Sequence, residues 1–85
     1  MNKYEQKPDQ VVDLHGLTTA EARYVLDEVF GGAYRHVRVI TGKGALRNGP
    51  VMRTFVEGYV RSRGFEFRYA KLADGGEGAL EVFTK

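Results

Sequence analysis

Asp13 and His15 are the two residues whose types and spacing could do acid–base chemistry. They follow the apolar residues Val11 and Val12 and precede Gly16, which is typical of a strand that ends in a loop. An imidazole can gain or lose a proton near neutral pH, and a neighbouring carboxylate can hold its tautomer and stabilise its cation. The spacing therefore predicts a general acid or base at this strand end. The alternative is a loop histidine and a strand-end acid that only satisfy backbone groups.

The elements that must position these residues alternate along the chain. Apolar residues at helical spacing predict one helix after Thr18 and a second that begins at Pro50. Alternating β-branched and aromatic residues predict strands, which cover residues 10–14, 36–41, 65–69 and 79–83. The order β-α-β-α-β-β predicts an α/β fold. It is a two-layer sandwich with a four-stranded mixed sheet and both helices on one face.

Both helices carry boundary signals. Thr18 and Glu21 have the spacing of a capping box. Gly31 and Gly32 are expected to end the first helix, with glycine in the left-handed conformation, and Gly64 is expected to end the second.

The connections between the strands predict their directions. Each β-α-β unit should be a right-handed crossover, so the first three strands should be parallel. The fourth strand returns through a hairpin and should be antiparallel. Because residues 79–83 are apolar enough for the inside of a sheet, the spatial order 1-2-4-3 is favoured over 1-2-3-4.

Three glycine-rich loops should meet at the carboxyl edge of the parallel strands. They are His15-Gly16, residues 42–49 and residues 72–78. Ligands of open α/β sheets bind at this edge, where both helices also begin and point free N–H groups outward. Lys43, Arg47 and Lys71 add cations. Together these features predict phosphate binding, although each glycine loop alone is also an ordinary connector.

Charge is unevenly distributed over a chain whose net charge is only +2. Residues 1–30 carry three basic and six acidic groups, whereas residues 31–85 carry ten basic and five acidic groups. A dense basic segment indicates a polyanionic partner, and a solvated basic face is the alternative.

Other chemistries have weaker support. The chain has no cysteine, which excludes disulfides and thiolate sites. Asp13, Asp74 and Glu77 are weak candidates for a metal site if the third loop folds over the first, although a two-metal nuclease usually has more carboxylates. The Gly42-Lys43-Gly44 loop lacks the spacing of a nucleotide-binding Walker A loop. His36 begins the second strand, at the opposite edge from His15.

Three ordered motifs resemble those of the small MutS-related (Smr) domain family. They are residues 12–18 (VDLHGLT), residues 39–44 (VITGKG) and the glycine-rich turn at 74–79 (DGGEGA). The resemblance covers about residues 10–85. It implies a fold similar to the C-terminal domain of bacterial translation initiation factor three. It also implies nuclease activity, which the family shows as DNA nicking and as RNA cleavage, including cleavage of messenger RNA on stalled or collided ribosomes.

The resemblance also assigns residues. It places the functional acid and histidine of the family at Asp13 and His15, and its glycine loop at Thr41, Gly42, Lys43 and Gly44. Family members often carry this domain at the end of a longer protein. Here residues 1–9 are expected to form a flexible polar tail before a domain of residues 10–85, so the chain is either a free-standing member or a domain excised from a longer protein.

Two functions of different classes are compatible with these patterns. The first is a cytoplasmic endonuclease that cleaves RNA, or that nicks DNA with Mg²⁺ or Mn²⁺. Asp13 and His15 would be catalytic, and nucleic acid would be bound by Thr41, Gly42, Lys43, Gly44, Arg47 and Lys71. The second is a nucleic-acid- or ribosome-binding module that does not cut. A protein adaptor that uses Phe65, Phe67 and Tyr69 is less favoured, because alternating aromatic residues are more often core. No stretch is long and apolar enough to predict a membrane span.

Overall fold

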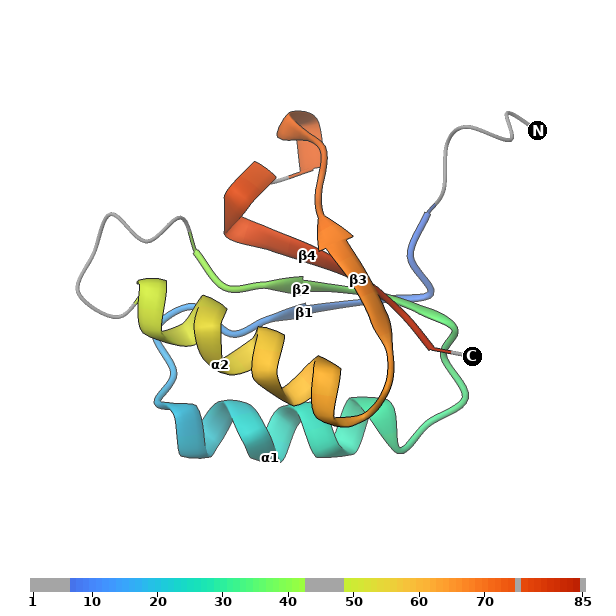
Figure 1. Ribbon diagram of the computed structural model, residues 1–85, viewed down its shortest axis with the longest axis horizontal. Coiled ribbons are helices and arrows are strands. Elements are labelled where there is room, and N and C mark those ends of the chain that lie inside the picture. Colours follow the sequence, from blue (N-terminus) through green and yellow to red (C-terminus); the bar gives the residue numbers. More distant parts are fainter. Residues whose placement is uncertain (1–6, 43–48, 75, 85) are drawn as a thin grey trace.

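The protein folds as a two-layer sandwich of one sheet and two helices (Figure 1). The structure is a computed structural model and describes residues 7–42, 49–74 and 76–84. Its elements are β1 (Gln10–Asp13), α1 (Thr19–Phe30), β2 (His36–Ile40), α2 (Gly49–Ser62), β3 (Glu66–Tyr69) and β4 (Ala79–Phe83). Two short 3-10 turns, Leu72–Asp74 and Gly76–Gly78, connect β3 to β4. The predicted fold class and element order are confirmed.

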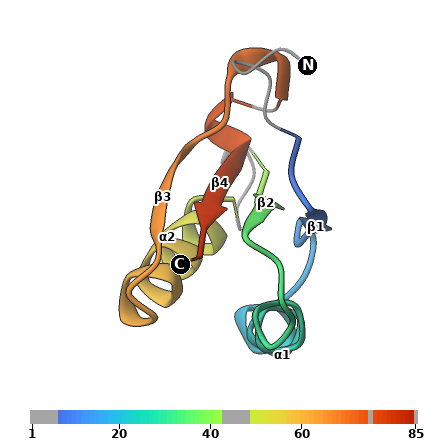
Figure 2. The same cartoon turned by 90° about the vertical axis from the view of Figure 1, so that its right-hand side faces the viewer.

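The strand order is β1-β2-β4-β3, as the favoured prediction has it (Figure 2). β1 pairs with β2 in parallel, and β4 pairs antiparallel to both β2 and β3. β4 lies inside the sheet, and its residues are buried on both faces, whereas β3 at the edge is short and largely exposed. The carboxyl ends of β1, β2 and β3 therefore lie on the same edge of the sheet.

The core lies between the helices and one face of the sheet. Alternate strand residues point into it, and each helix contributes one apolar face. The sheet contributes Val12, Leu14, Val37, Val39, Leu80 and Val82, and the helices contribute Ala22, Leu26, Phe30, Met52, Val56 and Val60. The other face of the sheet, called here the open face, has no helix on it (Figure 2).

The helices end at the glycines that the sequence predicts, but the backbone conformation at the end of α1 differs from the prediction. The Thr18 capping box is present, with both reciprocal hydrogen bonds. Gly64 has φ +74°, and the N–H groups of Gly64 and Phe65 bond to the carbonyls of Arg61 and Val60, which is the Schellman arrangement. The expected left-handed end of α1 is wrong, because Gly31 has φ −79°. Its N–H closes the last turn onto Asp27 instead.

The aromatic residues around β3 follow the predicted pattern in part. Phe65 and Phe67 are partly buried and pack against the core. Tyr69 is 41% exposed, and its hydroxyl donates a hydrogen bond to the Glu57 carboxylate on α2. Among the described residues, neither helix combines the length and apolar content needed to cross a membrane.

Candidate active site at the carboxyl edge of the sheet

Asp13 and His15 form a hydrogen-bonded pair where β1 ends. Val12 and Leu14 point into the core, so Asp13 and His15 are left exposed. The His15 Nδ1 lies 2.6 Å from the Asp13 Oδ1, and the His15 backbone N–H donates to the same oxygen over 3.0 Å. This carboxylate therefore favours the tautomer that carries its proton on Nδ1. That tautomer leaves the Nε2 lone pair free, and no described residue bonds to this atom.

The local chain explains why these side chains stay together. Leu17 N–H bonds to the Leu14 carbonyl, and Gly16 takes φ +81°, so the chain turns sharply before α1. Burial alone would raise the pKa of Asp13. The hydrogen bonds from the His15 ring and backbone outweigh that effect and hold the pKa of Asp13 below its ordinary value. Asp13 is thus an anion that can stabilise an imidazolium.

The second loop begins beside His15. Gly42 has φ +91°, and a β-carbon built on it would lie 3.9 Å from the His15 β-carbon. The backbone of Gly42 is therefore close enough to line the same site. Lys43, Gly44 and Arg47 fall outside the described residues, so their predicted phosphate contacts stay predictions.

Thr41 fastens two loops to each other. Its side chain is buried, and its hydroxyl lies 3.2 Å from the Gly42 carbonyl oxygen and 3.4 Å from that of Gly78. The N–H groups of Thr41 and Gly42 both donate to the Gly78 carbonyl, over 2.8 and 3.1 Å. The buried Thr41 side chain therefore gives no support to the prediction that Thr41 contacts nucleic acid. The geometry instead gives Thr41 the task of holding the second loop against the third.

The third loop follows β3 and leaves the sheet at the same edge as the first two loops. The chain rises here on the side of the sheet opposite the helices (Figures 1 and 2). Lys71 is exposed, and its carbonyl accepts the Gly76 N–H. The side chains of Asp74 and Glu77 fall outside the description, so the weak metal site that they would share with Asp13 stays a prediction. Within the described residues, no three His, Asp or Glu side chains gather as metal ligands.

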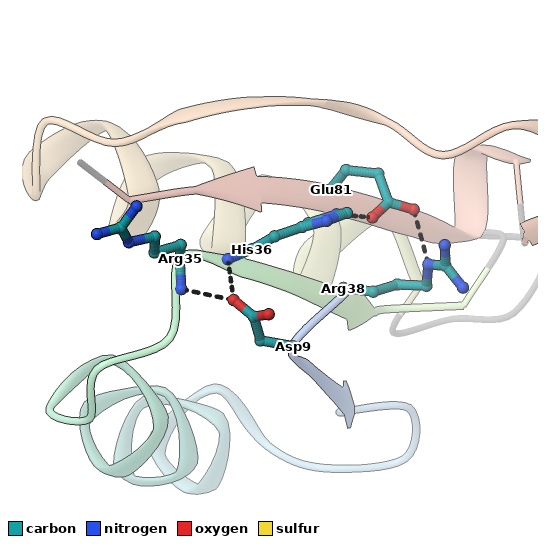
Figure 3. A network of polar contacts seen from close by, with 5 residues as sticks. All are labelled: Asp9, Arg35, His36, Arg38 and Glu81. Atoms are coloured by element: carbon teal, nitrogen blue, oxygen red, sulfur yellow. Dashed lines mark hydrogen bonds and ion pairs between the residues drawn. The ribbon is translucent and has the colours of Figure 1, made fainter. Parts of the chain in front are cut away.

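A second charged cluster lies on the open face, and the sequence did not predict it. Glu81 on β4 accepts hydrogen bonds from two residues of β2 (Figure 3). The His36 Nε2 lies 2.5 Å from Glu81 Oε1, and the Arg38 Nε lies 2.7 Å from Oε2. The His36 ring also stacks on Phe83, with centroids 4.6 Å apart. This cluster, called here the His36–Glu81–Arg38 cluster, joins two strands that are far apart in the sequence.

The position of this cluster argues against a role in the chemistry of His15. His36 lies four residues before Ile40, the register partner of Asp13, which places it about 13 Å away along the strand. Next to it, Asp9 accepts the backbone N–H groups of Arg35 and His36 over 2.9 and 3.1 Å. Asp9, predicted to lie in a flexible tail, is thus tied to β2, whereas residues 1–6 are outside the description. A signal for the cluster exists, since His36, Arg38 and Glu81 all occupy non-core strand positions.

Comparisons with known proteins agree with this geometry. The sequence profile of the Smr domain matches residues 12–85. The chain is 34% identical over 80 residues to endonuclease MutS2 of Carboxydothermus hydrogenoformans; the match covers 87% of this chain but only 10% of that protein. The chain thus spans about a tenth of this curated relative.

Solved structures share the fold. The crystal structure of the Smr domain of Thermus thermophilus MutS2 superposes with a TM-score of 0.77 at 29% identity, over 89% of this chain and 98% of that one. The human small-MutS related domain superposes with a TM-score of 0.66 at 32% identity, over 87% and 99% of the two chains.

Proposed function

The chain belongs to the Smr domain family, and on this premise we propose that it is an endonuclease that cleaves phosphodiester bonds, with RNA as its preferred substrate. The observation that carries the proposal is the Asp13–His15 pair. It combines a 2.6 Å contact with exposed side chains, at the sheet edge where ligands of such folds bind. The relative named an endonuclease supports the same reaction class.

The proposed reaction uses the RNA itself as the nucleophile. The His15 Nε2 removes the proton of a ribose 2′-hydroxyl, and the 2′-oxygen attacks the adjacent phosphorus. The bond to the 5′-oxygen breaks, and that oxygen takes up a proton from water, while the His15 imidazolium returns its proton to the solvent. The products carry a 2′,3′-cyclic phosphate and a 5′-hydroxyl. Asp13 keeps the Nδ1 proton in place and stabilises the imidazolium that forms.

Phosphate binding falls to the second and third loops. Lys43, Arg47 and Lys71 would neutralise the scissile or adjacent phosphates, and the N–H group of Gly44 would donate to their oxygens. The N-terminus of α2 adds a positive dipole at the same edge. A DNA substrate lacks the 2′-hydroxyl, so nicking would need an activated water and Mg²⁺ or Mn²⁺, with Asp13, Asp74 and Glu77 as the candidate ligands.

The proposal includes a cellular setting. An RNA endonuclease of this family fits the cytoplasm, with messenger RNA on stalled ribosomes as the substrate.

A second candidate function is nucleic-acid or ribosome binding without cleavage. The side chains of His15 and Asp13 are 72% and 48% exposed, so this pair is open to water rather than enclosed. Enclosure strengthens the electrostatic interactions that support catalysis, and an open pair suits a binding surface as well. Fold alone does not decide between the two.

The two functions separate in one assay. Labelled single-stranded RNA and supercoiled plasmid are each incubated with wild-type and His15→Ala protein, with and without EDTA. The proposal predicts EDTA-resistant RNA cleavage that falls about 10²–10⁴-fold in the variant. Unchanged cleavage by His15→Ala would exclude His15 as the catalytic group. Binding without cleavage by the wild type would favour the module.

A further inference from the structure

An open groove of about 400 Å³ runs between α1 and α2 on the outer surface of the helical layer. It lies away from the open face of the sheet and has no part in the chemistry of His15. The residues that line it include Arg23 and Asp27 from α1, Phe55, Gly58 and Tyr59 from α2, and Arg63, which follows α2.

The polar groups of the groove leave it with an excess of positive charge. The Asp27 carboxylate accepts the Tyr59 hydroxyl over 2.5 Å and the Arg63 guanidinium over 3.0 Å. Its charge is therefore compensated within the groove. Arg23 lies near Asp27 and helps to lower the pKa of that carboxyl group, but it donates no hydrogen bond to any described residue. Its guanidinium N–H groups are therefore available to a ligand. Such a groove suits an anionic ligand.

Two aromatic side chains and one glycine form the floor of the groove. Phe55 and Tyr59 are partly buried, with ring centroids 6.4 Å apart, and the Arg63 guanidinium lies 5.0 Å above the Tyr59 ring. Gly58 is exposed in the middle of α2, and a β-carbon built on it would meet nothing within 4 Å. Glycine lowers the stability of a helix interior. No described residue packs so closely against Gly58 that a larger side chain would clash, so packing does not explain a glycine at this position. A bare helix surface lets a ligand approach the backbone closely.

The groove begins near the edge of the sheet that carries the candidate active site. Both helices begin at the edge of the sheet that holds Asp13 and His15 and run away from it side by side (Figure 1). Arg23 is the fifth residue of α1, which places it about 6 Å from the start of that helix. A chain that leaves His15 over this edge would therefore meet Arg23 first and Arg63 last.

We propose that the groove between α1 and α2 binds the single-stranded RNA that flanks the cleaved bond. Arginines interleaved with aromatic side chains are the features that bind single strands with little sequence preference. The proposal rests on the proposed function, because it takes RNA as the ligand of the neighbouring site. It extends that function by giving the enzyme a second RNA-binding region, on the outer surface of α1 and α2 rather than at the edge of the sheet.

The test measures binding separately from cleavage. The ligand is a fluorescently labelled single-stranded RNA with 2′-O-methyl groups at every position, which blocks attack by the 2′-oxygen. Binding is followed by fluorescence anisotropy over a range of salt concentrations. Gly58→Glu and Gly58→Gln add side chains of nearly equal size, and only the first adds a negative charge. Thermal melting followed by circular dichroism confirms that each variant folds.

The expected results depend on charge and place. Gly58→Glu should weaken binding about tenfold or more, and Gly58→Gln about two- to threefold. Arg23→Gln should weaken binding and lower the salt slope by about 0.7 unit, the value for one contact to a single strand. Arg35→Gln removes an exposed cation that does not line the groove and should bind like the wild type.

Two outcomes would overturn the proposal, and they are distinguishable. If the wild type binds but Gly58→Glu and Arg23→Gln bind equally well, the groove is not part of the RNA site, and a protein ligand becomes its better occupant. If the wild type does not bind RNA at all, the groove proposal fails together with the proposed function.

Discussion

Two histidine–carboxylate pairs lie on the same sheet and differ in almost everything except the contact itself. The Asp13–His15 contact is 2.6 Å long, and the His36–Glu81 contact is 2.5 Å long. The side chains of the first pair are 72% and 48% exposed, and those of the second are 11% and 5% exposed. A short contact therefore does not identify a reactive site. The two pairs differ in how far solvent reaches their side chains, which is the property that the proposed chemistry depends on.

Different parts of the structure keep the histidine beside the carboxylate in the two pairs. Asp13 and His15 are two residues apart, and one turn of the chain keeps them together. His36 and Glu81 are 45 residues apart and depend on the β2–β4 register. Arg38 also donates its Nε–H to Glu81, so the buried carboxylate has two side-chain partners. The exposed pair can exchange a proton with a ligand, whereas the buried cluster fixes how two strands pair.

The largest effect is expected from breaking the buried cluster. Glu81→Gln removes the anion that His36 and Arg38 share, and we expect it to lower the free energy of unfolding by about 3 kcal/mol. Urea unfolding measures the loss. RNA cleavage per folded molecule should stay within about twofold of the wild type. A stable Glu81→Gln protein without cleavage would instead place the chemistry at the buried cluster.

An intermediate effect is expected at the exposed pair. Asp13→Asn removes the anion that stabilises the imidazolium, and we expect the cleavage rate to fall about 10²-fold. This loss is smaller than the roughly 10⁴-fold loss in a buried triad, because Asp13 is open to water. Stability should change by less than about 0.5 kcal/mol. Single-turnover kinetics at saturating RNA separate this loss from weaker binding. Glu28→Gln, which removes an exposed carboxylate of α1 that does not line the groove, is the matched control and should cleave at the wild-type rate.

A smaller effect with a defined pH dependence is expected at Asp9. Hydrogen bonds from the backbone of Arg35 and His36 hold the pKa of Asp9 below its ordinary value of 3.8. The ionised carboxylate therefore stabilises the fold above that value, and its contribution is lost as the pH falls through the lower folded-state pKa. Asp9→Asn should melt below the wild type at pH 7, and the difference should shrink as the pH falls below 3.8 and through the folded-state pKa. A difference that is constant from pH 7 to pH 2 would contradict this explanation.

The sequence was sufficient for features that depend on neighbouring residues. Alternation along the first strand separated Val12 and Leu14 from Asp13 and His15, and the capping residues located the start of α1. The apolar character of the last strand favoured its inner position. Each of these features follows from a period of the chain or from the chemistry of a turn.

Features that depend on register and on close packing were not predicted. The pairing of Arg38 with Glu81 requires the register of two strands, which alternation alone leaves open. The burial of Thr41 depends on the Gly78 carbonyl reaching it from the third loop. Gly31 ends its helix without a positive φ, because its N–H remains bonded to the preceding turn. In the first two cases a contact between residues distant in sequence decided the outcome.

The chemical ends of the cleaved RNA test the role of the exposed pair most directly. RNA cut by the wild-type protein in EDTA is analysed by mass spectrometry, beside the same RNA with a single 2′-deoxyribose at the cleavage position. Attack by the 2′-oxygen, with His15 as the base, predicts fragments with 2′,3′-cyclic phosphate and 5′-hydroxyl ends, and no cleavage at the deoxyribose. Fragments with 5′-phosphate ends, or unchanged cleavage at the deoxyribose, would contradict it.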